Sequence, residues 1–155
     1  MAAEYAFVDE WDVDAPIEEV FDALADARTY PTWWGTVFKE VDVSGPPAVG
    51  VVSTQHTKAR LPYHMRFSGT ITRLEPPNVL EYDVVGDFTG HGRWTLTDTG
   101  GNVHVRLDFR IHVGNHPVLR RLTPVFRPLF GWNHRWAMAR AMEGLEPYLR
   151  SRAAR

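Results

Sequence analysis

Cysteine is absent from this sequence of 155 residues, and long hydrophobic runs are absent too. Without cysteine, disulfides, thiolate nucleophiles and cysteine-ligated zinc sites are excluded. No apolar stretch approaches the roughly 20 residues of a membrane-spanning helix, and the acidic N-terminus, MAAEYAFVDE, lacks the apolar core of a signal peptide. We therefore expect a cytoplasmic protein.

Motifs for metals, nucleotides and nucleophilic catalysis are also missing. We find no HExxH pair, phosphate-binding glycine loop, dinucleotide fingerprint or GxSxG elbow. The glycine-rich stretch GDFTGHG, residues 86–92, lies between predicted strands and is typical of a hairpin. His104, Asp108 and His112 share one face of a predicted strand, but steps of four residues separate neighbours by ~13 Å, too far for one ion. The sequence therefore predicts no metal site and no cofactor.

Charge is unevenly distributed along the chain. Residues 1–100 carry a net charge of −9 and residues 101–155 a net charge of +7. Such asymmetry can mark a nucleic-acid or membrane-binding face, but no nucleic-acid motif accompanies the arginines. Hydrophobic residues make up 44% of the chain, the usual share for a soluble globular protein. We therefore interpret the asymmetry as attraction between two halves of a single domain, residues 1–155, and expect no nucleic-acid partner.

The first predicted elements are a strand and two short helices. Residues 5–14 alternate, and the apolar face holds Tyr5, Phe7, Trp11 and Val13. The following segment, DAPIEEVFDALAD, has Pro16 at the first helical position and a helical apolar stripe. RTYPTWW, residues 28–34, predicts a second helical turn that ends at two tryptophans.

The remainder predicts a run of strands and then a long helix. Turn signals such as SGPP, EPPN and TGGN separate the strands. Pro128 suits the start of the helix, and Pro147 is expected to kink or end it near Glu146. The strands are expected at residues 36–43, 49–60, 63–75, 79–87, 91–98 and 103–113.

This order predicts an α+β fold. Antiparallel strands with one apolar face need a cover, and only the C-terminal helix is long enough to supply it. We expect a helix-grip fold, in which a curved antiparallel sheet of about seven strands wraps around that helix, with two short helices after the first strand. The gap between sheet and helix is where a small apolar ligand would bind.

Five motifs, in this order and spacing, give the chain its resemblance to a known superfamily. They are DAPIEEVFDALAD with YPTWW (Asp14–Trp34), LPYHMRF (Leu61–Phe67), LEPPNVLEY (Leu74–Tyr82), GDFTGHGRW (Gly86–Trp94) and WNHRWAM (Trp132–Met138). The chain resembles the START-like, or birch-allergen-like (SRPBCC), superfamily over nearly its whole length, and specifically the polyketide cyclase/dehydrase-like branch. The resemblance implies a cavity for a hydrophobic molecule; some members cyclise or dehydrate aromatic polyketides, and others carry lipids, hormones or quinones. It implies no universal set of catalytic residues.

Two positions depart from the family pattern. Arg135 stands where an acidic residue is usual, and Met142 stands near a position where glycine is usual. The bulkier Met142 is expected to narrow the cavity.

The helix containing GWNHRWAMARAM, residues 131–142, is apolar on two sides. Met138 and Met142 fall on one stripe, with His134 one turn earlier, and flexible thioethers suit an adaptable cavity wall. Trp132 and Trp136 fall on the other side. We expect the segment Leu119–Phe130 to fold over these tryptophans, with a homodimer contact or an anionic membrane surface as the alternatives.

Asp9 and His134 are the candidate catalytic residues. Asp9 occupies the apolar register of the first strand, between Phe7 and Trp11, so a regular strand would turn its carboxylate into the cavity. A buried carboxylate needs a partner, and His134 is one candidate. The alternatives are a bulge that turns Asp9 outward and a core histidine bonded only to backbone or water.

The candidate ligand-binding residues are apolar side chains that fall on inward registers or at the second short helix. Aromatic rings supply contact area for a flat ligand, although an individual residue of this kind more often belongs to the plain core than to a pocket. These candidates are Trp11, Trp33, Trp34, Tyr82, Trp94, Met138 and Met142.

Three functions remain open from the sequence. The first is a polyketide cyclase or dehydratase that holds an aromatic or polycyclic small molecule, with Asp9 or His134 moving protons. The second is a non-catalytic carrier of a lipid or hydrophobic metabolite. The third is an interaction module that uses Trp132 and Trp136; a membrane-surface partner is not favoured, and both a monomer and a homodimer are compatible with the sequence.

Overall fold

The computed structural model describes residues 4–61, 64–112 and 117–153, with only the backbone described for residues 117–127 and 153. Its elements follow the predicted order. They are β1 (Glu4–Val13), α1 (Ile17–Ala25), the 3₁₀ turn η1 (Ala27–Thr29), α2 (Tyr30–Trp33), β2 (Phe38–Val43), β3 (Val52–Thr57), β4 (Met65–Glu75), β5 (Val79–Gly86), β6 (Thr89–Asp98), β7 (Val103–His112) and α3 (Pro117–Ala153). The α+β fold class is confirmed.

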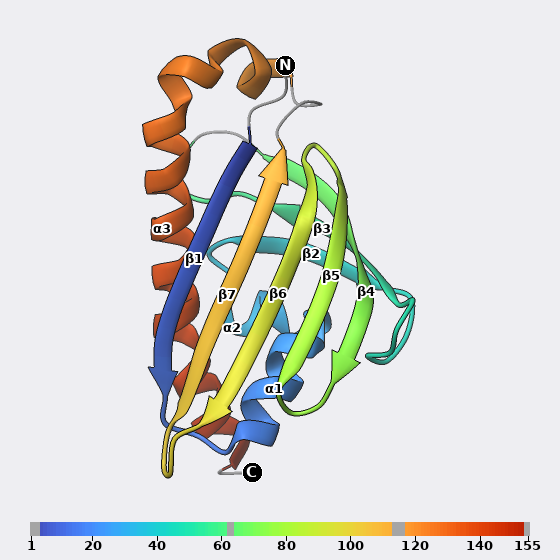
Figure 1. The fold of residues 1–155 in the computed structure, drawn as a ribbon, viewed down its shortest axis with the longest axis vertical. Coiled ribbons are helices and arrows are strands. Elements are labelled where there is room, and N and C mark those ends of the chain that lie inside the picture. Colours follow the sequence, from blue (N-terminus) through green and yellow to red (C-terminus); the bar gives the residue numbers. More distant parts are fainter. Residues whose placement is uncertain (1–3, 62–63, 113–116, 154–155) are drawn as a thin grey trace.

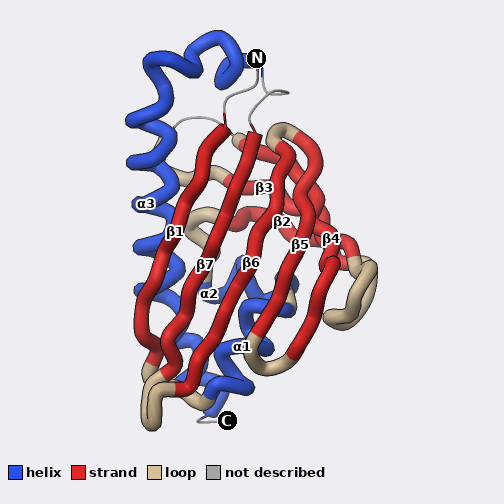
Figure 2. The backbone as a smooth tube through the Cα atoms, in the orientation of Figure 1, coloured by secondary structure: helices blue, strands red, loops and turns tan. Residues whose placement is uncertain are grey.

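Within the described residues, the strands form one seven-stranded antiparallel sheet in the order β1-β7-β6-β5-β4-β3-β2. From β2 to β7, each strand pairs with the next strand along the chain. The first strand, β1, pairs with the last one, β7. Figures 1 and 2 show the sheet curling, so that β2 and β3 cross behind β7 and β6 while α3 runs beside β1. The short helices α1 and α2 lie on the concave side (Figure 1). This is the predicted helix-grip arrangement.

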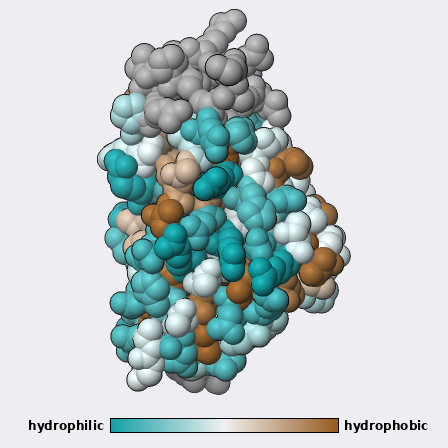
Figure 3. Space-filling view, in the orientation of Figure 1, coloured by the Kyte–Doolittle hydropathy of each residue, from teal (hydrophilic) through white to brown (hydrophobic). Residues whose placement is uncertain are grey.

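The two faces of the sheet have opposite polarity. On β7, Val103, Val105, Leu107 and Ile111 are buried on the concave face. The alternate residues point outward and form ion pairs, such as that between Arg106 and Asp108 at 2.9 Å. Figure 3 shows the outward face as mostly hydrophilic, with scattered apolar residues. Strand alternation therefore decides which side chains meet the helix.

Helix α3 is longer than predicted. It begins at Pro117 rather than Pro128, and it continues through Pro147 to Ala153 instead of ending near Glu146. Pro147 removes only the N–H that would reach the carbonyl of Glu143, and both residues are exposed, so water can bind that carbonyl. Figure 1 shows the first turns of α3 running across one end of the sheet before the helix turns down beside β1. Within the described residues, no helix carries a stretch apolar enough to cross a membrane.

Two clusters of buried side chains form the core. The larger one joins α1 and α2 to the sheet and to the second half of α3, where Ala141, Leu145 and Leu149 are almost fully buried. The smaller one lies around Phe130, at the other end of the concave face, with Tyr5, Met65, Val84, Phe88 and Ile111. Residues of both clusters border the space between sheet and helix.

Candidate functional site

An internal cavity of about 190 Å³ lies between the concave face of the sheet, the short helices and α3. An apolar cavity of roughly 150 Å³ accommodates a benzene ring, so this one has room for an aromatic ring. Most of the wall is apolar. Ten of the described lining residues are aromatic: Phe7, Tyr30, Trp34, Phe38, Phe67, Tyr82, Phe88, Trp94, Phe109 and Phe130.

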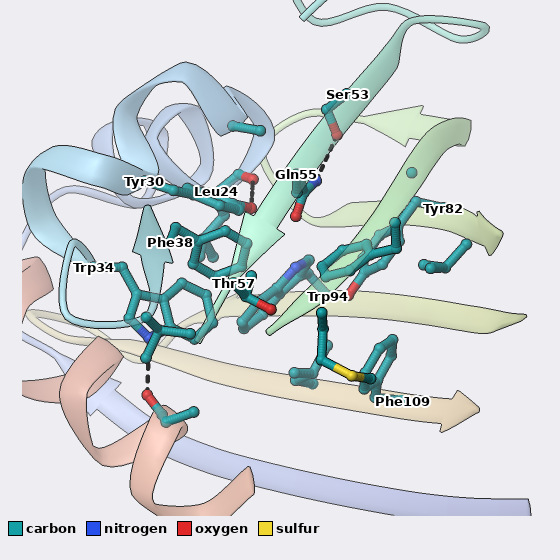
Figure 4. Close-up of a pocket in the computed structure, with 18 of the residues that line it drawn as sticks. Leu24, Tyr30, Trp34, Phe38, Ser53, Gln55, Thr57, Tyr82, Trp94 and Phe109 are labelled. Carbon is teal, nitrogen blue, oxygen red and sulfur yellow. Dashed lines mark hydrogen bonds between the residues drawn. The ribbon is translucent and has the colours of Figure 1, made fainter. Parts of the chain in front are cut away.

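A group of polar side chains from β3 also faces the cavity. Ser53, Gln55 and Thr57 all line it, and Gln55 Nε2 donates a hydrogen bond to Ser53 Oγ at 2.6 Å (Figure 4). Gln55 and Thr57 are buried. Sequence reasoning missed these residues because both faces of VSTQHT are polar, so alternation gave no signal about which face is buried.

Two tyrosines line the cavity in different ways. The hydroxyl of Tyr30 donates a hydrogen bond to the carbonyl oxygen of Leu24 at 2.5 Å. Burial raises the pKa of Tyr30 and of Tyr82 well above the usual phenol range, so both stay protonated at neutral pH. The hydroxyl of Tyr82 forms no hydrogen bond with any described residue, although the side chain lines the cavity. Tyr82 can therefore donate to a polar group of a ligand.

Asp9 and His134 meet at the junction of β1 and α3. His134 Nε2 lies 2.7 Å from Asp9 Oδ2, and the side chains are each only 14% exposed. The strand keeps its parity, because Asp9 stands opposite Leu107 in an unbroken β1–β7 register. The alternative of a bulge that turns Asp9 outward is therefore wrong. Of the two residues, His134 lines the cavity and Asp9 lies behind it.

The hydrogen bond fixes the protonation pattern of the imidazole. A carboxylate oxygen only accepts, so Nε2 of His134 carries the proton and Nδ1 of a neutral ring is a base. No described residue forms a hydrogen bond with Nδ1. The ring stacks on Phe7, with centroids 3.9 Å apart and planes 14° apart. This stacking and the bond to Asp9 hold the imidazole in one orientation.

Four of the seven candidate ligand-binding residues line the cavity: Trp34, Tyr82, Trp94 and Met138. Trp34 is held by a hydrogen bond from its Nε1 to the carbonyl oxygen of Ala137, at 2.8 Å. The three others, Trp11, Trp33 and Met142, do not line the cavity, so the structure gives no support to their predicted contact with a ligand.

Each of those three residues has a physical reason for its position. Trp11 packs edge-on against Trp94, with centroids 5.9 Å apart. Trp33 turns toward the 3₁₀ turn and donates from Nε1 to Thr29 Oγ1 at 2.9 Å. Met142 lies beside the inward stripe of α3, which follows Met138, Ala141, Leu145 and Leu149, so it does not narrow the cavity.

The tryptophans on the outer side of α3 are only partly covered. Trp132 is 42% exposed and Leu129, three residues earlier, is 43% exposed. Trp136 is half-buried, with the Arg140 guanidinium 5.1 Å from its ring centroid. The segment Leu119–Phe130 is part of α3 and does not fold back over this face, and the side chain of Phe130 is buried on the cavity side. The side chains of residues 117–127 of α3 lie outside the described part of the chain.

Metal ligands do not gather around this site. Among the described residues, no group of three or more histidine, aspartate or glutamate side chains is arranged to hold a metal ion. The cavity thus combines apolar walls with two polar features, the Asp9–His134 pair and the side chains of Ser53, Gln55 and Thr57 on β3. A curved sheet closed by a long helix over such a cavity is a hydrophobic-ligand-binding fold of the helix-grip class.

The chain belongs to the family described as polyketide cyclase / dehydrase and lipid transport, whose model matches residues 6–150. The resemblance to the SRPBCC superfamily and its polyketide cyclase-like branch is thereby confirmed. No curated protein matches the sequence significantly.

Solved structures with the same fold share little sequence with this chain. The di-domain ARO/CYC protein BexL of the BE-7585A biosynthetic pathway has a TM-score of 0.69 at 17% identity, with 92% of this chain covering 50% of that one. The chain thus spans about half the length of that di-domain protein. TTHA0849 from Thermus thermophilus has a TM-score of 0.80 at 16% identity, over 95% of this chain and 98% of that one. Norcoclaurine synthase from Thalictrum flavum has a TM-score of 0.64 at 13% identity, over 99% and 98%.

Proposed function

We propose that this protein binds an aromatic or polycyclic small molecule in its cavity and promotes ring closure or dehydration of that molecule. The observation that carries the proposal is the 2.7 Å hydrogen bond between Asp9 and His134 at the cavity wall. A carrier needs apolar walls but no oriented proton-transfer pair. The description of the family names cyclases and dehydrases beside lipid transport, so it is compatible with either function, and the choice rests on the Asp9–His134 pair.

His134 is the proposed general acid and base. In an intramolecular aldol condensation, neutral His134 Nδ1 takes a proton from the carbon next to a ketone. The resulting enolate carbon attacks a second ketone carbon, and a carbon–carbon bond forms. The imidazolium protonates the new alkoxide, which gives a hydroxyl group and regenerates neutral His134. Neutral Nδ1 then takes the second proton from the same carbon, and the imidazolium passes it to the departing hydroxide, which leaves as water. The net change is loss of one water, and the histidine returns to its starting state.

Asp9 is a positioning residue in this scheme. Its carboxylate holds the imidazole through Nε2 and stabilises the imidazolium that forms when Nδ1 takes a proton. The aromatic walls fold the flexible chain so that its reacting carbons lie close together, and this positioning supplies much of the rate. The hydroxyl of Tyr82 and the amide of Gln55 are proposed to bind oxygen atoms of the substrate.

A linear 1,5-diketone with an aryl substituent is a suitable test substrate, because ring closure gives a conjugated enone that absorbs in the near ultraviolet. Asp9→Asn and His134→Ala should each lower kcat by about 100-fold or more, the range for lost acid–base catalysis. The Kd for the diketone, measured by tryptophan fluorescence, should stay within about threefold, since most of the contact area remains.

The matched control is His56→Ala, which removes a histidine from the outward-facing register of β3. Its kcat should equal that of the parent. Binding of the diketone without turnover by the parent would favour a carrier. Full activity in both site variants would show that His134 moves no protons and that Asp9 does not position it for catalysis.

A further inference from the structure

A second pocket lies against the outer side of α3. Its described lining consists of Thr36, Lys39, Lys58, Ala59, Arg60 and Trp136. Lys39 and Lys58 are the only lysines in the whole sequence. Three of the seven basic residues in the acidic first 100 residues therefore meet in one pocket.

Hydrogen bonds between distant parts of the chain build this pocket. The N–H of Lys58 donates to the carbonyl oxygen of Val37 at 2.9 Å, which joins the end of β3 to the start of β2. The N–H of Leu61 donates to Asn133 Oδ1 at 2.9 Å, which ties the chain after Arg60 to α3. The pocket is therefore a fixed part of the fold.

The cations of this pocket have no carboxylate partner among the described residues. Arg28, Arg73 and Arg106 each form ion pairs elsewhere in the structure. Lys58 and Arg60 form none with a described residue, and Lys39 Nζ donates only to the carbonyl oxygens of Gly35 and Thr36, each at 3.1 Å. Three neighbouring positive charges repel one another, and an anion between them would relieve that repulsion.

The pocket adjoins the ligand cavity. Ala59 lines both, and Thr57, which flanks Lys58 on the other side, also lines the cavity. On α3, Trp136 lines the pocket and the next residue, Ala137, lines the cavity. A molecule that extends from the cavity past Ala59 into the pocket would place its charged end among the cations and its apolar body in the cavity.

We propose that this cationic pocket binds the anionic head, a carboxylate or a phosphate, of an amphiphilic ligand whose apolar body occupies the cavity. The inference rests on the proposed binding function, but it does not depend on catalysis. Lys58 and Arg60 donate charge-assisted hydrogen bonds to the head, and Trp136 supplies an apolar wall. The Arg140 guanidinium stacked on Trp136 keeps that indole in place.

Matched probes test this directly: decanoate, decyl phosphate and decan-1-ol share one chain and differ in head charge. By isothermal titration calorimetry, the parent should bind decanoate and decyl phosphate about tenfold more tightly than decan-1-ol, the gain from roughly one charge-assisted hydrogen bond. The Lys58→Gln/Arg60→Gln double variant should lose this preference and keep the parent's affinity for decan-1-ol within about twofold. Arg110→Gln is the control, because Arg110 is an exposed cation on the outward face of β7; it should change nothing.

Two further arms separate the possible failures. Gly69→Val, which fills the cavity, should weaken all three probes; if it weakens none, the cavity does not bind ligand and the proposed function fails. If Gly69→Val acts as expected but the double variant keeps the preference for charged heads, the head-group inference alone is overturned. Inorganic phosphate should compete with decanoate and not with decan-1-ol. Phosphate binding without any preference for charged amphiphiles would assign the pocket to a separate anion and overturn the inference.

Discussion

The backbone of Gly144 lies directly against the carbonyl oxygen of Trp33. A Cβ atom built on Gly144 would lie 1.9 Å from that oxygen, far inside van der Waals contact. This approach seats the end of α2 on α3, and the hydrogen bond from Trp34 Nε1 to Ala137 provides a second link. The position of Trp34 in the cavity wall therefore depends on glycine, which has no side chain, at position 144 of α3.

Gly144→Ala should destabilise the protein by about 1–3 kcal/mol, because α2 must move away from α3. The matched control is Gly131→Ala in the same helix, where the nearest atom to a new Cβ is the end of the Arg135 side chain, at 3.5 Å. This control should be neutral or up to about 1 kcal/mol stabilising through helix propensity. Urea unfolding at neutral pH measures both, and equal stability of the two variants would contradict the close approach.

Gly69→Val should fill the cavity without unfolding the sheet. A Cβ on Gly69 would meet Ser53 Oγ at 3.5 Å and Gln55 Nε2 at 3.7 Å, which are ordinary contacts. Valine also suits a strand interior better than glycine, so stability should rise by about 0.5–1 kcal/mol. Binding of an aromatic probe such as naphthalene should weaken by about tenfold or more. Unchanged probe binding, with the fold intact by circular dichroism, would place the ligand elsewhere.

Two histidines on the outward face of the sheet should make stability depend on pH. His91 lies between Asp83 and Glu81, at 2.8 and 3.0 Å, and these carboxylates raise its pKa. His104 lies between Glu10 and Asp12, at 3.1 and 3.0 Å, and they raise its pKa in the same way. Two carboxylates can both accept hydrogen bonds only from an imidazolium, which donates from both nitrogens.

Because these folded-state pKa values lie above the unfolded value of 6.5, the stabilisation is complete below that pH. It is lost as the pH rises through the raised values. The urea midpoint of the parent should therefore fall more between pH 6 and pH 9 than that of the His91→Gln/His104→Gln variant. His56 offers a contrast, because partial burial lowers its pKa, and the positive charge of Arg66 lowers it further. His56→Gln should instead raise the midpoint below pH 6.5, and parallel curves for all variants would refute the assignment.

Alternation explains why so much of the sheet could be predicted. In VHVRLDFRIH every second residue is apolar, so the buried and outward faces of β7 follow directly, and the same rule placed Asp9 on the concave face of β1. Where both faces of a strand are polar, as in VSTQHT, the rule gives no answer. That is why Ser53, Gln55 and Thr57 were missed as cavity residues.

Helical spacing was similarly informative but incomplete. It placed His134 and Met138 on the cavity side of α3. It could not show that Met142 lies beside that stripe, or that the helix passes through Pro147, because neighbouring elements and solvent decide both outcomes.

The sequence alone determined which residues share a face, because the periods of strands and helices are local properties of the backbone. Only the tertiary structure decided which faces meet. Asp9 and His134 are 125 residues apart, and they touch because β1 pairs with β7 at the edge where α3 crosses. Lys39, Lys58 and Arg60 share a pocket with Trp136 only because the start of β2 and the end of β3 lie against that helix. Such contacts depend on how the sheet curls around α3, and no local pattern in the chain encodes that curvature.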